Sequence, residues 1–426
     1  ARMGSDDFTW VAQAIAIHRE VGGNLAEVLD AVGNTIRERN AIRRQVKALS
    51  AEGTENATWG TVVMIGTIWA IFGPAIFGHI SDRLGRRKPF IAIGAALTVI
   101  ALAVLMNANS LGVIIAGYLL LQFSDDFGQG ALQAIIPERV PIELRGKASG
   151  VMAMLEQGAQ LFIGLYAFGV TKVAGEAAVP TIYVTLALLN ILCALMTLRT
   201  LAGAEKLVQV EAARAPGSIA NFFKSWLAPW RSSDFSWVWG TKLLNAVGFY
   251  CAQLYLRNYL DASVGTFGPF GDNVDLAVIV LGLTISLSAV FGALWSARSA
   301  DRIGRKKVIY IAGTAMSLLL IPFALVPIFT VIWGLAALFG IGYGAYLGAT
   351  WALVSDVLPS ADSLGTDMGI WAAGLTVGQM IAGGAGHLVD VLNRNQAGLG
   401  YTVVFLIGGA MFFLSTVFVR FIKGST

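Results

Sequence analysis

Long apolar runs constrain this chain more than any other feature of its sequence. Each is close to the ~20 residues that cross a hydrocarbon core of ~30 Å. Only 13% of the residues are charged, against about 25% in a soluble domain. We therefore predict an all-α membrane protein with eleven transmembrane helices, at 58–80, 89–107, 111–136, 148–170, 180–198, 235–260, 276–297, 308–326, 328–354, 368–389 and 401–419.

Basic residues gather in alternate loops between these runs. They follow the first run at 83–88, the third at 139–147 and the seventh at 298–307, and they also occupy the linker at 199–234. The positive-inside bias places these loops and the C-terminus in the cytoplasm of a multi-pass protein of the inner (plasma) membrane, in contact with the lipid bilayer. Because Lys and Arg form no single stripe, no nucleic-acid partner is indicated.

An internal repeat relates the two halves of the chain. The segment Gly78-x-x-x-Asp82-Arg83-x-Gly85-Arg86-Arg87 recurs 219 residues later as Ala297-x-x-x-Asp301-Arg302-x-Gly304-Arg305-Lys306. Glu138, Pro141 and Gly150 likewise fall opposite Asp356, Pro359 and Gly369. Two halves on one plan are typical of transporters built from parallel repeats.

The repeated loop signature resembles that of the major facilitator superfamily, over about 58–426. The resemblance implies a two-bundle fold in which Asp82 and Asp301 each meet the positive end of a neighbouring helix and a guanidinium, closing the cytoplasmic side. Gly85 and Gly304 would allow the tight turn. The other predicted gating residues are cations, which could alternatively only set the topology: Arg83, Arg86, Arg87, Arg302, Arg305 and Lys306.

The resemblance also implies a helix before residue 58, where the only apolar run, 8–17, is too short to cross a membrane. Residues 8–53 instead resemble the F-type platform domain of type II secretion and tight-adherence pilus systems, through Ile17-His18-Arg19-Glu20-Val21-Gly22-Gly23-Asn24 and Arg43-Arg44-Gln45-Val46. The topology would put them outside, so we interpret this extramembrane helical segment as a fusion; a soluble cap helix is the alternative. The predicted parts are 1–57, a five-span bundle at 58–198, a linker at 199–234 and a six-span bundle at 235–426.

Polar residues inside the apolar runs are candidates for substrate binding or proton coupling, because charges are costly in lipid. Asp126 and Gln129 share a helix face, as do Glu156 and Gln160. Lys242 could be the counter-ion of an acidic group, and aromatic rings could stack on a sugar. Each residue could alternatively serve packing or internal pairing only; the full set is Asp125, Asp126, Gln129, Glu156, Gln160, Lys242, Asn245, Tyr343 and Trp351.

No enzyme is predicted. The histidines are far apart in sequence, and no phosphate-binding G-x-x-x-x-G-K-[ST] loop is present; no metal or cofactor is expected. The resemblance implies secondary active transport of a small solute by alternating access, with a proton or cation as the coupling ion. Gln129-Gly130 and Arg86-Arg87-Lys88-Pro89 resemble sugar-transporting branches, which makes sugar–proton symport the specific expectation. A missing first helix would impair transport, and the alternative is a non-transporting protein, either a pseudo-transporter or a secretion or pilus platform component.

Overall fold

The computed structural model describes residues 66–202 and 225–424. All described residues belong to one compact unit. The predicted secretion-like segment and most of the predicted linker lie outside the described residues. Within the described ranges the regular secondary structure is helical, which confirms the predicted all-α class.

The helices of the first half follow the predicted apolar runs. Residues 66–84 are helical, and Gly85 turns the chain with a φ of +61°. Pro89 then lies in the first turn of the next helix, where its missing N–H costs no hydrogen bond. The following helices are α3 (Lys88–Met106), α4 (Leu111–Gln133), α5 (Ile135–Arg139), α6 (Arg145–Ala174) and α7 (Ala178–Ala202).

The second half contains more buried helices: α9 (Ser233–Tyr259), α10 (Val274–Ile303), α11 (Arg305–Leu325), α12 (Phe329–Val357), α13 (Leu364–Gly384), α14 (Gly386–Asn395) and α15 (Leu399–Phe418). The predicted run at 368–389 is divided in the structure, because α13 ends in a pair of glycines and α14 begins beyond Ala385. Among the described helices, eight are long and apolar enough to cross a membrane. The number of eleven spans stays a prediction.

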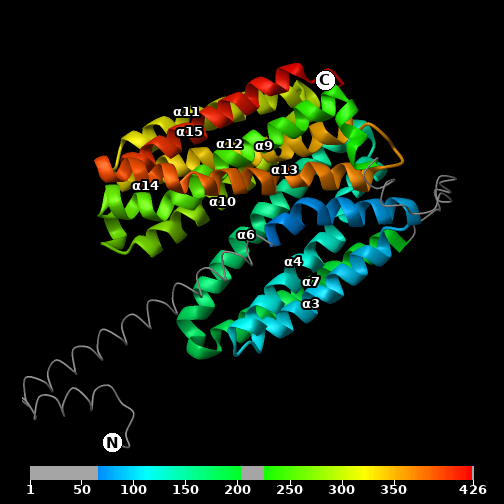
Figure 1. Cartoon of the computed structure of the whole chain (residues 1–426), viewed down its shortest axis with the longest axis horizontal. Helices are drawn as coiled ribbons and strands as arrows, with labels where there is room; N and C mark the ends of the chain where they lie inside the picture. Colours follow the sequence, from blue (N-terminus) through cyan, green and yellow to red (C-terminus); the bar gives the residue numbers. More distant parts are fainter. Residues whose placement is uncertain (1–65, 203–224, 425–426) are drawn as a thin grey trace, which may run out of the picture. The chain divides into compact units, whose positions relative to one another are not determined.

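Packing between the helices brings the two halves together along two seams. Within the halves, α3 packs on α4 and α7, whereas α10 packs on α12 and α15 packs on α9 and α11 (Figure 1). Between the halves, α6 packs against α10 and α12, and α13 packs against α4. Large apolar side chains on α7 are exposed, including Leu188, Leu192 and Leu195, as expected of a helix that faces lipid.

Candidate functional site

A cavity of about 410 Å³ lies between the two halves of the described unit. The helix at 66–84, α4 and α6 form one side, and α9, α12 and α13 form the other. The structure brings together most of the predicted binding and coupling residues at its wall: Asp125, Asp126, Gln129, Glu156, Gln160, Lys242, Tyr343 and Trp351. Asn245 does not line the cavity; its side chain is buried on α9, one turn from Lys242.

The acidic wall of the cavity is on α4. Asp126 is only 2% exposed, and the Gln122 amide donates to both of its carboxylate oxygens at 3.4 Å. A Cβ at Gly73 would lie 2.9 Å from Asp126, so only glycine lets the helix at 66–84 approach α4 this closely. Asp125 is the more exposed member of the pair. Gln122 was missed by the sequence analysis, although it precedes Asp126 by four residues and so shares its helix face.

A cation lies opposite, on α9. The Lys242 ammonium sits 4.3 Å above the Trp371 ring, and Trp371 in turn meets Trp351 edge-to-face at 4.7 Å. The carboxylate of Glu156, on α6, lies close enough to Lys242 for their charges to interact. Glu156 belongs to the first half and Lys242 to the second, so this interaction crosses the interface between the halves.

Aromatic and amide groups complete the wall. Phe249 and Tyr343 are stacked with their centroids 4.6 Å apart, next to Gln160 and Gln253. Flat apolar rings beside convergent donors, acceptors and charges are the usual composition of a site for a small polar molecule. The described residues contain no group of three or more side chains suited to holding a metal ion.

The first repeated loop joins the two halves at the end of the unit that carries the basic loops, called here the basic end. Asp82 accepts hydrogen bonds from the backbone N–H groups of Gly365 and Thr366 at 2.9 and 2.8 Å, and from the Thr366 hydroxyl at 2.8 Å. The Arg87 guanidinium lies 2.7 Å from the same carboxylate and 3.2 Å from Glu138. We call these contacts the first latch.

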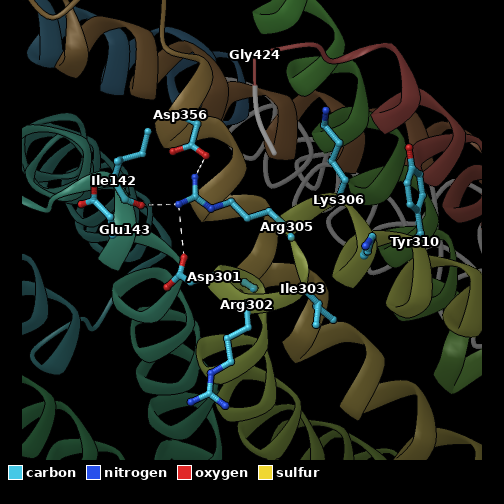
Figure 2. A pocket seen from close by; sticks show the side chains of 13 residues that line it. Ile142, Glu143, Asp301, Arg302, Ile303, Arg305, Lys306, Tyr310, Asp356 and Gly424 are labelled. Atoms are coloured by element: carbon cyan, nitrogen blue, oxygen red, sulfur yellow. Dashed lines mark hydrogen bonds and ion pairs between the residues drawn. The ribbon is translucent and has the colours of Figure 1, made fainter.

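The second repeated loop makes the corresponding contacts on α6. Asp301 accepts from the N–H groups of Gly146 and Lys147 at 3.0 and 2.9 Å. Arg305 lies between Asp301 and Asp356 and donates to the Ile142 carbonyl at 2.7 Å (Figure 2). These contacts, the second latch, border a surface pocket of about 840 Å³.

The structure divides the predicted gating residues into those that join the halves and those that do not. Asp82, Asp301 and Arg305 make contacts between the halves, whereas Arg87 contacts Asp82 and Glu138 of its own half. Gly304 turns the chain with a φ of +96°. Arg86 and Arg302 are exposed, and in Figure 2 Arg302 points away from Asp356, whereas Lys306 lies apart from it. Arg83 is half-buried beside Asp82. The gating role of the set stays a prediction.

Three further charged residues complete the latches and were missed: Glu138, Arg145 and Asp356. Arg145 donates to the carbonyls of Pro137, Val140 and Ser355, and its guanidinium lies 3.5 Å from Asp356. The sequence could have indicated the two acids as functional residues, because Glu138 and Asp356 occupy equivalent positions of the repeat. Each of these acids contacts an arginine of the repeated loop in its own half.

Comparison with known proteins supports both resemblances seen in the sequence. The profile of the Major Facilitator Superfamily matches residues 46–364 and 264–425, and that of type II secretion system protein F matches residues 1–73. The proline/betaine transporter of Escherichia coli K12 is 36% identical over 89 residues, which are 20% of this chain and 17% of that relative. The chain thus matches less than a fifth of the length of this curated relative.

Solved structures share the fold. The proton:xylose symporter XylE has a TM-score of 0.64 at 18% identity, covering 87% of each chain. The human organic anion transporter MFSD10 has a TM-score of 0.61 at 16% identity, covering 83% of this chain and 82% of its own. With the family profile matching most of the sequence and the helices arranged as in these structures, the chain belongs to the major facilitator superfamily and is a multi-pass membrane protein.

Proposed function

We propose that this protein is a secondary active transporter of a small polar solute, which it carries across the inner (plasma) membrane by alternating access with a proton or another cation. The observation that supports this most directly is the cavity between the halves, where Asp126, Glu156 and Lys242 converge. Charges placed in a membrane protein are costly, and their usual role is on a substrate or ion pathway.

Both latches support the alternating-access part of the proposal. Each joins one half to the other at the basic end, which we assign to the cytoplasm by the positive-inside bias. Opening the cavity to that side requires the contacts of Asp82 with α13 and of Asp301 with α6 to break. Closing re-forms them, as expected of two bundles, 58–198 and 235–426, that rock about a central site.

Sugar–proton symport is the specific form that we favour for the substrate and coupling ion. Tyr343 and Trp351 offer aromatic faces for a sugar ring, while Gln129 and Gln160 can donate to and accept from hydroxyl groups. Asp126 or Glu156 would carry the proton. The proton:xylose symporter XylE has the same fold, but its 18% identity to this chain supports only the fold and not the substrate.

A zwitterion is the second candidate substrate, and one observation favours it. The cavity holds a cation on one half opposite a carboxylate on the other, so a solute with one negative and one positive group could bridge Lys242 and Glu156. The rings of Phe249 and Tyr343 in the same wall would also suit a quaternary ammonium group. The short match to a proline/betaine transporter agrees with this candidate.

Uptake into proteoliposomes distinguishes the candidates. The full chain is reconstituted, and labelled xylose, glucose, proline and glycine betaine are offered with and without an inward proton gradient. Saturable uptake of a sugar that is stimulated by the gradient supports the first candidate; uptake of proline or betaine supports the second.

The variants Glu156→Gln and Lys242→Gln should lower uptake at least tenfold, whereas the control Asp390→Asn, an exposed residue on α14, should not. Absence of uptake and of binding for all four solutes would favour a non-transporting protein.

A further inference from the structure

Asp367, in the first turn of α13, is a fully buried carboxyl group that the latch contacts do not use. Its side chain is 0% exposed. One oxygen accepts a hydrogen bond from the Ser363 hydroxyl at 3.2 Å, and the other has no hydrogen-bond partner among the described residues. A buried carboxylate without a cation or a full set of donors is strongly disfavoured relative to the neutral acid.

The charged groups around Asp367 do not supply the missing partner. Asp82 of the helix at 66–84 takes the free N–H groups at the start of α13, so two carboxyl groups share one helix end. The Arg87 guanidinium contacts Asp82 and Glu138. His79 approaches the Thr366 hydroxyl at 3.5 Å. Further along, the charges on α9 and α4, Lys242 and Asp126, line the central cavity.

The internal repeat shows that the latch itself does not need this carboxyl group. Gly146 and Lys147 of the second latch correspond to Gly365 and Thr366 of the first, and the residue that follows them is Ala148 where the first latch has Asp367. The second latch nevertheless forms the same pair of N–H contacts, to Asp301. The N–H contacts of a latch therefore form with an alanine at this position, and they do not require the carboxyl group of Asp367.

We propose that Asp367 is a proton-binding group that couples the protonation state of the protein to the closing of the basic end. The carboxyl group holds its proton while α13 is packed on the helix at 66–84. When the two helices separate, water reaches the group, the O–H bond breaks and the proton passes to water at the basic end. The closed state then binds one proton more than the open state.

The direction of the pH effect follows from this difference. Because closing takes up a proton, raising the pH favours the open state, and the ratio of closed to open molecules falls by up to about tenfold per pH unit. The role of this pH effect in transport rests on the alternating access proposed above, whereas the pH effect itself does not. Opening and closing can be measured without any substrate, so a failure here is distinguishable from a failure of the transport proposal.

Distances between spin labels test the proposal. Cysteines replace the exposed residues Leu84 and Ala361, on either side of the first latch, in a chain that also carries Cys193→Ser and Cys251→Ala. Pulsed electron resonance then gives the closed fraction of the full-length protein in lipid nanodiscs between about pH 5 and pH 9. The proposal expects the closed fraction to fall with rising pH.

Three variants identify the group that titrates. Asp367→Asn should stay closed across the whole pH range. If this variant does not fold, Asp367→Ala, which copies the alanine of the second latch, replaces it in the experiment and should also stay closed. His79→Gln should keep the pH dependence of the parent. The proposal is overturned if the parent protein shows no pH dependence, if either Asp367 variant retains it, or if His79→Gln abolishes it.

Discussion

Replacement of Asp82 by asparagine tests the physical basis of the first latch. The carboxylate accepts three hydrogen bonds from α13 and pairs with Arg87, and its side chain is 5% exposed. Asparagine is almost the same size but has no charge, and its amide NH2 would face the N–H donors of Gly365 and Thr366. A hydrogen bond to a charged group contributes about 1 kcal/mol more than a neutral one, and the start of a helix adds up to ~2 kcal/mol.

The expected loss for Asp82→Asn is therefore about 2–4 kcal/mol of the free energy that favours the closed state, a roughly 30- to 900-fold fall in the closed-to-open ratio. Asp301→Asn should cost less, about 1–2 kcal/mol, because Asp301 is 22% exposed, accepts two N–H bonds and lies 3.5 Å from Arg305.

The spin-label pair at positions 84 and 361 measures both variants, since both latches join the same two halves. Measurements at one pH hold the solution conditions constant across the variants. The control is Arg302→Gln, which changes an exposed charge of the same loop. An unchanged closed fraction in both aspartate variants would refute the reasoning and leave the basic residues as topology signals only. A larger effect at Asp301 than at Asp82 would refute the ranking.

Three further predictions concern packing, charge geometry and topology. Gly369→Leu should lower the free energy of unfolding by about 1–3 kcal/mol, measured by thermal denaturation in detergent, because even a Cβ at 369 would lie 2.5 Å from the backbone of the helix at 66–84. Arg305→Lys should reduce closing because lysine cannot bridge Asp301 and Asp356 as a guanidinium does; Arg302→Lys should have no effect, and equal effects of the two would contradict this account. Cysteines at Lys307 and Asp390 should react with an impermeant reagent from opposite sides of the membrane, and labelling from one side would refute the topology.

The sequence determined the fold class and most of the candidate site. Uninterrupted apolar runs can bury their backbone polar groups in lipid only as helices, so their positions predicted the long helices α3, α4, α6, α7, α9 to α13 and α15 to within several residues. The cost of charges in lipid singled out Asp126, Glu156 and Lys242 before any geometry was known. The repeat at an offset of 219 residues predicted two related loops. Each of these conclusions depends on the order of residues along the chain and not on which helices are neighbours.

The tertiary structure decided which residues act together. The repeat aligns Arg86 with Arg305, yet the arginine that contacts Asp82 is Arg87, because α3 begins at Lys88 whereas α11 begins at Arg305. Asn245 is one turn from Lys242 but lies outside the cavity. Asp367 sits in a predicted loop, and only the packing of α13 buries it. Contacts between residues more than 200 positions apart depend on how helices pack against one another. The pattern of apolar and polar residues within one helix does not say which other helix packs against it.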